Sequence, residues 1–282
     1  MKIGHFCSYY VGSLVYRNLF SNLSDLAVES YLYIPIRNKN HYNKNTFSDD
    51  NVHFHYVHIL GLLTRVSLFW KTFLNVIFSY LYFKHKKLDY IHAHTFYSDG
   101  FSAYFVSLLL KLPLLITFRA TDCNLGFRFY FHYNLFAKLI LNRASSIVFV
   151  SHSHKNAFVA NFGSHYNSKV KVIPNGIDSV YLDDYLICKS TQTPRFFNDR
   201  YKNSTVCTYI GSIDLNKNIK NSVSAFFSLH KNNSIFIIIG GSYDDYVSVY
   251  GEITESYKNN VIFLGRLNAS QIKNVLYCCN AI

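Results

Sequence analysis

The chain has 282 residues, half of them hydrophobic, with 24 Tyr and 25 Phe, and its formal net charge is +12. This length suits two domains of ~100 to 200 residues each, and the apolar content excludes a disordered chain. The charge favours an anionic partner: a phosphorylated substrate, a nucleic acid or an anionic membrane surface.

The cellular compartment is predicted from cysteines and apolar runs. Six cysteines are scattered through the sequence without CxxC spacing. The first residues, Met1 to His5, lack the apolar run of a signal peptide. No segment reaches the ~18 uninterrupted apolar residues of a membrane-spanning helix. We therefore expect a cytoplasmic protein.

The first part of the chain alternates between strand-like apolar runs and helix-like stripes. Most runs are separated by apolar residues at helical spacing, such as the stripe that starts at Val15. This alternation predicts a doubly wound, Rossmann-like α/β domain with a parallel sheet. Strands are expected to begin near Lys2, Ser30, Val52, Leu88, Pro113, Ser145 and Val170.

Two interpretations stay open for the apolar segment from Ser67 to Phe83. It is rich in aromatic residues but is interrupted by Lys71, Asn75 and Ser79. It could be a core helix with a few polar positions, or an interfacial helix that rests on a bilayer.

Three histidines on one predicted strand raise the question of a metal. His53, His55 and His58 lie in the alternating segment that starts at Val52. No cysteine or carboxylate completes a ligand set, and a solvated strand face explains the histidines as well. We predict no metal site.

Polar residues and a glycine follow several strands of the first half. Gly12 lies in the loop after the first strand, where a glycine lets a ligand approach the backbone. His94 follows the strand that starts near Leu88, and Arg119 and Asp122 follow the next one. Ligands of open α/β sheets bind at the carboxyl ends of strands, so we expect the chemistry there.

A sharp turn, VIPNGID over Val172 to Asp178, ends this first half. Pro174 cannot donate to a sheet ladder, and Asn175-Gly176 readily takes positive φ. We interpret the turn as a hinge. The predicted domains are residues 1–176, a hinge and linker over 177–204, and a second Rossmann-like domain over 205–282.

The second half repeats one device three times. Strands are expected over Thr205 to Ile210, Ser234 to Ile239 and Asn260 to Leu264, and each ends in a glycine-bearing loop. Such loops bring backbone N–H groups close to an anion such as a diphosphate. Lys217 would add a mobile positive charge beside them. The glycines are Gly211, Gly240, Gly241 and Gly265.

Together these motifs resemble the retaining glycosyltransferases of family 4. The resemblance rests on VIPNGID (172–178), DYIHAHTFYSDG (89–100), ITFRATD (116–122), YIGSIDLNKNI (209–219), IIIGG (237–241) and NVIFLGRL (260–267). It implies the GT-B fold, in which two Rossmann-like domains face each other across a cleft. It also implies transfer of a sugar from a nucleotide-sugar, with retention of configuration and no metal requirement.

The resemblance assigns roles by position. Lys217 matches the lysine that binds the donor diphosphate, and Ser212 stands where an arginine is common. Arg119 stands where many members have a histidine after the same strand, and Lys217 and Arg119 are the expected catalytic residues. The remaining expected donor-binding residues are Gly12, Gly240, Gly241, Gly265 and Arg266; His94 and Asp122 are expected on the acceptor side, and Pro174, Asn175 and Gly176 in the hinge.

The family pattern also contains two glutamates, seven residues apart, in the strand and loop after the helix that begins near Ile272. The chain ends at Ile282, before them. We therefore expect an incomplete second domain. An inactive, truncated remnant that binds a nucleotide or a partner chain stays an alternative, as does an epimerase of the same fold. A nucleic-acid-binding protein is disfavoured because its sequence motifs are missing.

The same resemblance suggests the pathway. We expect a bacterial enzyme of surface polysaccharide assembly, such as capsule or O-antigen, acting on a glycan or lipid-linked acceptor. The basic charge fits peripheral contact with the anionic inner face of the cytoplasmic membrane.

Overall fold

The structure, a computed structural model, describes two compact units. The residues that the structure describes are 1–119, 122, 134–177, 179–181, 204–229, 233–277 and 279. The units are Met1–Gly176 and Ile177–Ile282, and each is described by itself. Most of the predicted linker, 177–204, lies outside the described residues, as does Asp178 of the predicted hinge.

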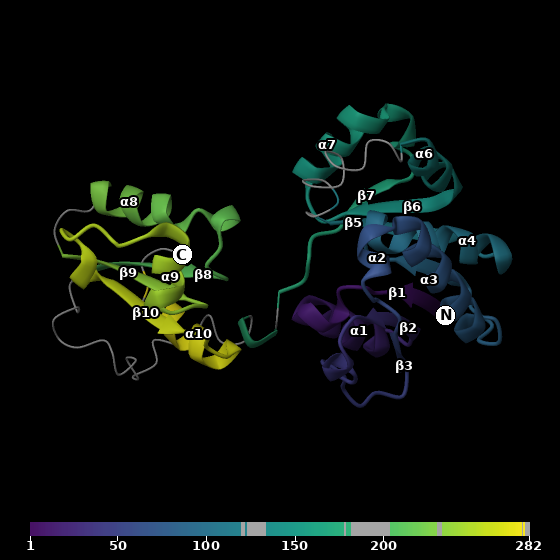
Figure 1. Cartoon of the computed structure of the whole chain (residues 1–282), viewed down its shortest axis with the longest axis horizontal. Helices are drawn as coiled ribbons and strands as arrows, with labels where there is room; N and C mark the ends of the chain where they lie inside the picture. Colours follow the sequence, from purple (N-terminus) through teal and green to yellow (C-terminus); the bar gives the residue numbers. More distant parts are fainter. Residues whose placement is uncertain are drawn as a thin grey trace. The chain divides into compact units, whose positions relative to one another are not determined.

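The first unit is built on a parallel sheet of seven strands (Figure 1). Its order, β3-β2-β1-β4-β5-β6-β7, is that of a doubly wound sheet. The direction in which successive strands are added reverses between β1 and β4. The seven predicted strands are confirmed. They are β1 (Lys2–Phe6), β2 (Glu29–Ile36), β3 (Val52–His58), β4 (Tyr90–Ala93), β5 (Leu114–Phe118), β6 (Ala144–Phe149) and β7 (Val170–Val172).

Helices connect most of these strands, as parallel pairing requires. A π-helical turn, Phe96–Gly100, leads from β4 into the helix that follows it. The helices are α1 (Leu14–Asp25), α2 (Leu63–Val66), α3 (Leu68–Phe83), α4 (Phe101–Leu109), α6 (Asn134–Arg143) and α7 (His152–Phe162).

Both faces of this sheet are buried, as is usual for parallel strands. Along β2 the side chains alternate between two apolar clusters. Tyr31 and Tyr33 belong to a cluster with residues of α3, α4, α6 and α7. Leu32 and Ile34 belong to a second cluster with residues of α1. The sheet is therefore held between two packed layers of side chains.

Helix α3, which covers most of segment 67–83, combines buried polar side chains with exposed apolar ones. Its polar Asn75 and Ser79 are buried, and Tyr33 donates a hydrogen bond of 3.1 Å to Asn75 Oδ1. Its exposed side chains are apolar and include Phe69, Phe73 and Leu81. The helix thus turns polar groups toward the protein, together with apolar ones such as Phe83, while its exposed face is apolar, the reverse of the polar exposed face of an ordinary surface helix.

The second unit contains a parallel sheet of three strands, in the order β10-β9-β8. These strands match the three predicted ones. Alternate residues of β9 pack on α8 and α9 at one face and on α10 at the other. The elements are β8 (Thr205–Ile210), α8 (Ile219–Leu229), β9 (Ser234–Ile239), α9 (Tyr243–Tyr250), β10 (Val261–Gly265) and α10 (Ala269–Leu276).

Within the described part of the chain, none of the helices combines the length and the apolar character needed to cross a membrane.

Candidate functional site

Arg119 is held at the carboxyl edge of the first sheet by three separate segments. Its Nε donates to the His94 carbonyl at 3.3 Å, and its Nη1 donates to Asn175 Oδ1 at 3.2 Å. Its Cζ lies 4.5 Å from the centre of the Tyr16 ring, within range of a cation–π interaction. The guanidinium is therefore placed by the residue after β4, by α1 and by the predicted hinge residues that follow β7.

Asp122 fixes the loop that carries Arg119. Its carboxylate accepts the backbone N–H groups of Phe96 and Tyr97 at 3.1 and 3.0 Å, and that of Arg119 at 3.1 Å. Burial raises the pKa of Asp122, and these three donors act in the opposite direction. Asp122 is buried and positions two loops, and its expected place on the acceptor side stays a prediction.

Asp99 is a buried carboxylate that we did not predict from the sequence. It accepts hydrogen bonds from Ser8 N at 3.2 Å, from Ser8 Oγ, and from Thr95 Oγ1 at 2.9 Å. Desolvation raises the pKa of Asp99 to about 6, although the Ser8 bonds and the charge of Lys71 lower it. Asp99 joins the loop after β1 to the turn after β4. Its signal in the sequence is the Asp-Gly pair at the start of a helix.

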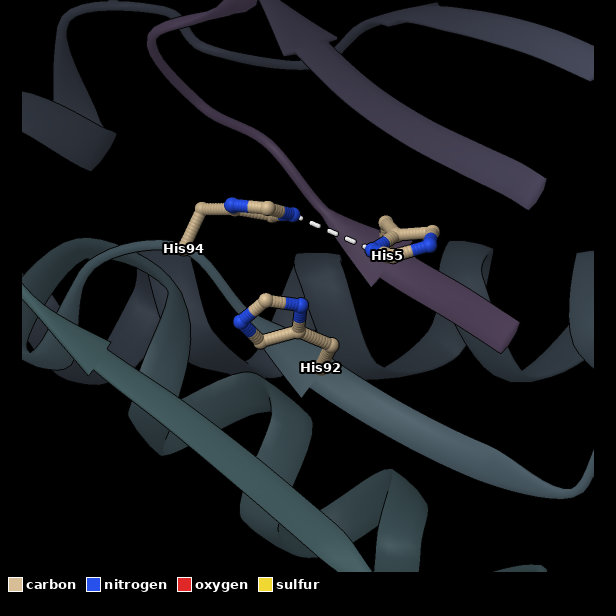
Figure 2. Close-up of side chains that lie close together, drawn as sticks. All are labelled: His5, His92 and His94. Carbon is tan, nitrogen blue, oxygen red and sulfur yellow. Dashed lines mark hydrogen bonds between the residues drawn. The ribbon is translucent and has the colours of Figure 1, made fainter. Parts of the chain in front are cut away.

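His94 was also predicted on the acceptor side, and it too is fully buried. Its Nε2 lies 3.1 Å from Nδ1 of His5, and His92, at the end of β4, lies beside both (Figure 2). Burial lowers the pKa of His94 and of His5, and burial together with Arg119 lowers that of His92 to about 4. All three imidazoles are therefore neutral near pH 7.

Gly12 closes a short 3-10 turn, Tyr10–Gly12, after β1. A Cβ added at Gly12 would meet no other atom within 4 Å. A larger residue therefore fits the fold, and the space beside Gly12 is open. The role of this glycine in donor binding stays a prediction.

Gly211, Gly240 and Gly265 bring three loops of the second unit into close contact. Gly240 has φ +123, and a Cβ there would lie 2.1 Å from the Gly211 carbonyl oxygen. The Gly240 N–H donates to the Gly265 carbonyl at 2.7 Å, and Gly265 has φ +67. The Gly240 amide is therefore occupied, and any backbone contact of this loop with an anion must come from another N–H group.

Lys217 is exposed in the 3-10 turn Leu215–Lys217 between β8 and α8. Asp214 shapes this turn, because its side chain accepts from Ser212 Oγ at 2.7 Å and from Asn216 N at 3.0 Å. The Ser212 bond, more than other contacts, lowers the pKa of Asp214. Ser212 thus supports the turn that presents the lysine.

The remaining predicted donor residues follow the two other strands of this sheet. Gly241 comes after β9, and a Cβ there would lie 2.6 Å from Ile213 Cδ1, a flexible side chain. Arg266 comes after β10 and is exposed. Parallel strands end at one edge, so Lys217, Gly241 and Arg266 share the carboxyl edge of the second sheet.

The histidines of β3 do not form a site. His53 Nε2 lies 3.2 Å from Glu29, and the His58 ring bonds to the Arg37 carbonyl at 2.9 Å. His55 stacks on Tyr82, with ring centres 4.1 Å apart. Each histidine is thus engaged by a different neighbour.

Two Rossmann-like parallel sheets in one chain, each with polar or glycine-bearing loops at its carboxyl edge, are the architecture of the GT-B class. The model of Glycosyltransferase Family 4 matches residues 13–180, more than half of the chain. The chain belongs to glycosyltransferase family 4 and is a transferase of that kind.

Solved structures agree in fold. The Anabaena protein HepE, in complex with UDP and glucose, is 17% identical with a TM-score of 0.61, and the match covers 99% of this chain and 72% of HepE. A glycosyltransferase from Rickettsia africae is 15% identical with a TM-score of 0.67, over 99% of this chain and 71% of its own. The lipopolysaccharide outer core galactosyltransferase WaaB is 14% identical with a TM-score of 0.59, over 96% and 70%. No curated protein sequence matches this chain.

Proposed function

We propose that the chain transfers a sugar from a UDP-sugar donor to a lipid-linked glycan, in the assembly of a bacterial capsule or O-antigen. Family membership supports sugar transfer. HepE, solved with UDP and glucose, supports a UDP-sugar donor. WaaB, a lipopolysaccharide galactosyltransferase, supports a glycolipid acceptor.

The carboxyl edge of the second sheet suits a donor diphosphate. Lys217 is exposed there, and its ammonium can stabilise the negative charge that develops on the departing diphosphate. In the proposed reaction the acceptor hydroxyl attacks from the face that the diphosphate leaves, so configuration is retained. Because Lys217 supplies the positive charge, this step is proposed to need no metal.

An apolar cavity in the first unit carries the proposal of a lipid-linked acceptor. It has a volume of about 460 Å³ and lies among α3, α4 and α6. Such a cavity can take a hydrocarbon chain out of water, which yields about 0.8 kcal/mol per buried CH₂ group. Its lining is apolar except for Thr72: Leu68, Phe69, Phe73, Val76, Phe101, Phe105, Leu108, Leu109 and Phe136.

The surface around this cavity fits an anionic bilayer. Besides Phe69 and Phe73, exposed apolar side chains on α2 and α3 include Val66 and Leu81. The exposed cation Arg65 on α2 adds attraction to anionic headgroups. We place the chain at the inner face of the cytoplasmic membrane, where lipid-linked glycans are extended.

A transfer assay tests the donor side of this proposal. The purified chain is incubated with radiolabelled UDP-sugars and a membrane extract that contains polyprenyl-linked glycans, and label in the lipid fraction is measured. Lys217→Ala should lower transfer about 10- to 100-fold, because a charged contact to the leaving group is lost.

The matched control is Lys258→Ala. Lys258 lies just before β10, at the opposite edge of the same sheet, and should leave transfer unchanged. NMR of the product should show the donor's anomeric configuration. Equal losses in both variants would argue against the assigned donor edge, and an inverted product would refute retention.

A further inference from the structure

Three histidines meet at the carboxyl edge of the first sheet, inside the first unit. His5 lies in β1, His92 lies in β4 and His94 follows β4. One potential ligand atom from each lies within 4.8 Å of the others, and no carboxylate belongs to the group. Figure 2 shows one ring nitrogen of each histidine facing the space between the three rings.

The neutral state of this trio favours a metal ion, provided that the proton between His5 Nδ1 and His94 Nε2 moves to the other nitrogen of its ring when the ion binds. Burial keeps the rings neutral, and a neutral imidazole offers one lone pair to a ligand. His92 Nε2 lies 2.9 Å from Thr117 Oγ1, which leaves His92 Nδ1 to face its two neighbours. A second hydrogen bond of this kind orients ligating histidines in many metal proteins.

One of the three distances already matches a coordination sphere. Two nitrogens about 2.05 Å from a tetrahedral Zn²⁺ ion lie ~3.3 Å apart. The His5 Nδ1 and His94 Nε2 atoms are 3.1 Å apart. His92, the least buried of the three, would have to approach by rotation of its side chain.

The surroundings of the trio set the kind of ion and its affinity. Phe20 meets the His5 and His94 rings edge-on, and Tyr16 meets His94 in the same way. The charge of Arg119 acts on His94 and opposes a cation. A hydroxide as fourth ligand would offset part of this repulsion, because zinc lowers the pKa of bound water to about 7.

We propose that His5, His92 and His94 bind one Zn²⁺ ion, with a water or hydroxide in the fourth position. The ion would replace the His5–His94 hydrogen bond and join β1 to the end of β4, next to the carbonyl that Arg119 contacts. It would act as a structural clamp and stands apart from the proposed transfer chemistry.

The test uses the full chain, stripped with a chelator and titrated with Zn²⁺ by calorimetry. We expect one ion per chain and a rise in the melting temperature. The Co²⁺ form should show the strong visible absorption of a four-coordinate site. X-ray absorption of the zinc form should count three imidazoles.

Variants assign the ligands. His92→Gln should weaken zinc binding at least about 100-fold, and Thr117→Val about tenfold, because the first removes a ligand and the second only its support. His58→Gln, at the end of β3, is the matched control and should bind as the wild type does. Circular dichroism of each metal-free variant verifies its fold.

Four outcomes would overturn the proposal. They are no binding by the folded wild type, unchanged binding by folded His92→Gln, an equal loss in His58→Gln, and fewer than three imidazoles around the ion. The last measurement is made on the wild type, so it tests the proposal even if His92→Gln does not fold.

Discussion

Arg119 Nη1 donates to Asn175 Oδ1 at 3.2 Å, across 56 residues of sequence. The bond joins the loop after β5 to the chain that leaves the first unit, which ends at Gly176. Any change in the direction of that exit segment therefore pulls on the guanidinium. We infer that the exit segment helps to set the position of Arg119.

The first prediction concerns this bond. Asn175→Ala should lower kcat/KM for transfer about three- to tenfold, the value of one partly exposed hydrogen bond to a charged group. Stability should change by less than about 0.5 kcal/mol, because Asn175 is exposed. The control is Asn161→Ala, which removes one exposed side-chain bond on α7. Equal activity of the two variants would show that Asn175 does not position Arg119.

Local patterns predicted the strands and the residues that follow them. The near-continuous apolar run of β5 is a property of neighbouring residues, and Arg119 follows it directly. In a parallel sheet, chain order alone then places Arg119 and His94 at one edge. The two sheets and their carboxyl edges were accessible from the sequence for this reason.

Contacts across long distances in sequence were not accessible. His5 meets His94 across 89 residues, and Ser8 meets Asp99 across 91. Sequence spacing drew attention to the β3 histidines instead, although alternate residues of a strand need not converge. The reversed polarity of α3 was likewise hidden, because its pattern shows a stripe but not which side faces the protein.

The second prediction concerns the glycine loops. Gly240→Ala should destabilise the second unit by about 2–4 kcal/mol, because its Cβ would collide with the Gly211 carbonyl and its φ is positive. Gly12→Ala should cost little, because its Cβ meets open space. Thermal melting of both variants gives the comparison. A Gly240→Ala protein as stable as Gly12→Ala would contradict the close approach of the two loops.

The third prediction concerns Asp99 and pH. The pKa of Asp99 is raised from 3.8 to about 6, so between these values the folded chain holds a proton that the unfolded chain releases. Its contribution to stability is present below about pH 4 and is lost as the pH rises through 6. The loss amounts to about 3 kcal/mol for two pKa units of a buried group.

Asp99→Asn isolates this contribution. The three histidines of the trio, whose pKa values are lowered, act in the opposite direction and destabilise the fold as the pH falls below 6.5. They remain in both proteins, as do Lys71, Cys7 and Tyr33, which interact with Asp99 electrostatically. Urea unfolding in chelator from pH 4 to 7 should therefore show a wild-type-minus-variant difference that falls with pH. A flat difference would mean that Asp99 titrates normally.

The fourth prediction concerns the reversed helix α3. Phe69 is 79% exposed beside the apolar cavity, and Leu26, outside this surface, is 74% exposed. Both apolar side chains are exposed to water, but only Phe69 lies where a bilayer would cover it. Phe69→Gln should weaken binding to anionic vesicles about fivefold or more, since an interfacial Phe contributes ~1 kcal/mol or more. Leu26→Gln should bind as the wild type does.

Sedimentation with vesicles also reports the electrostatic part of the binding, because added salt should weaken binding through screening of cations such as Arg65. Equal binding by both variants would show that this face does not bind the bilayer. Its apolar side chains would then be available only for the lipid of the acceptor.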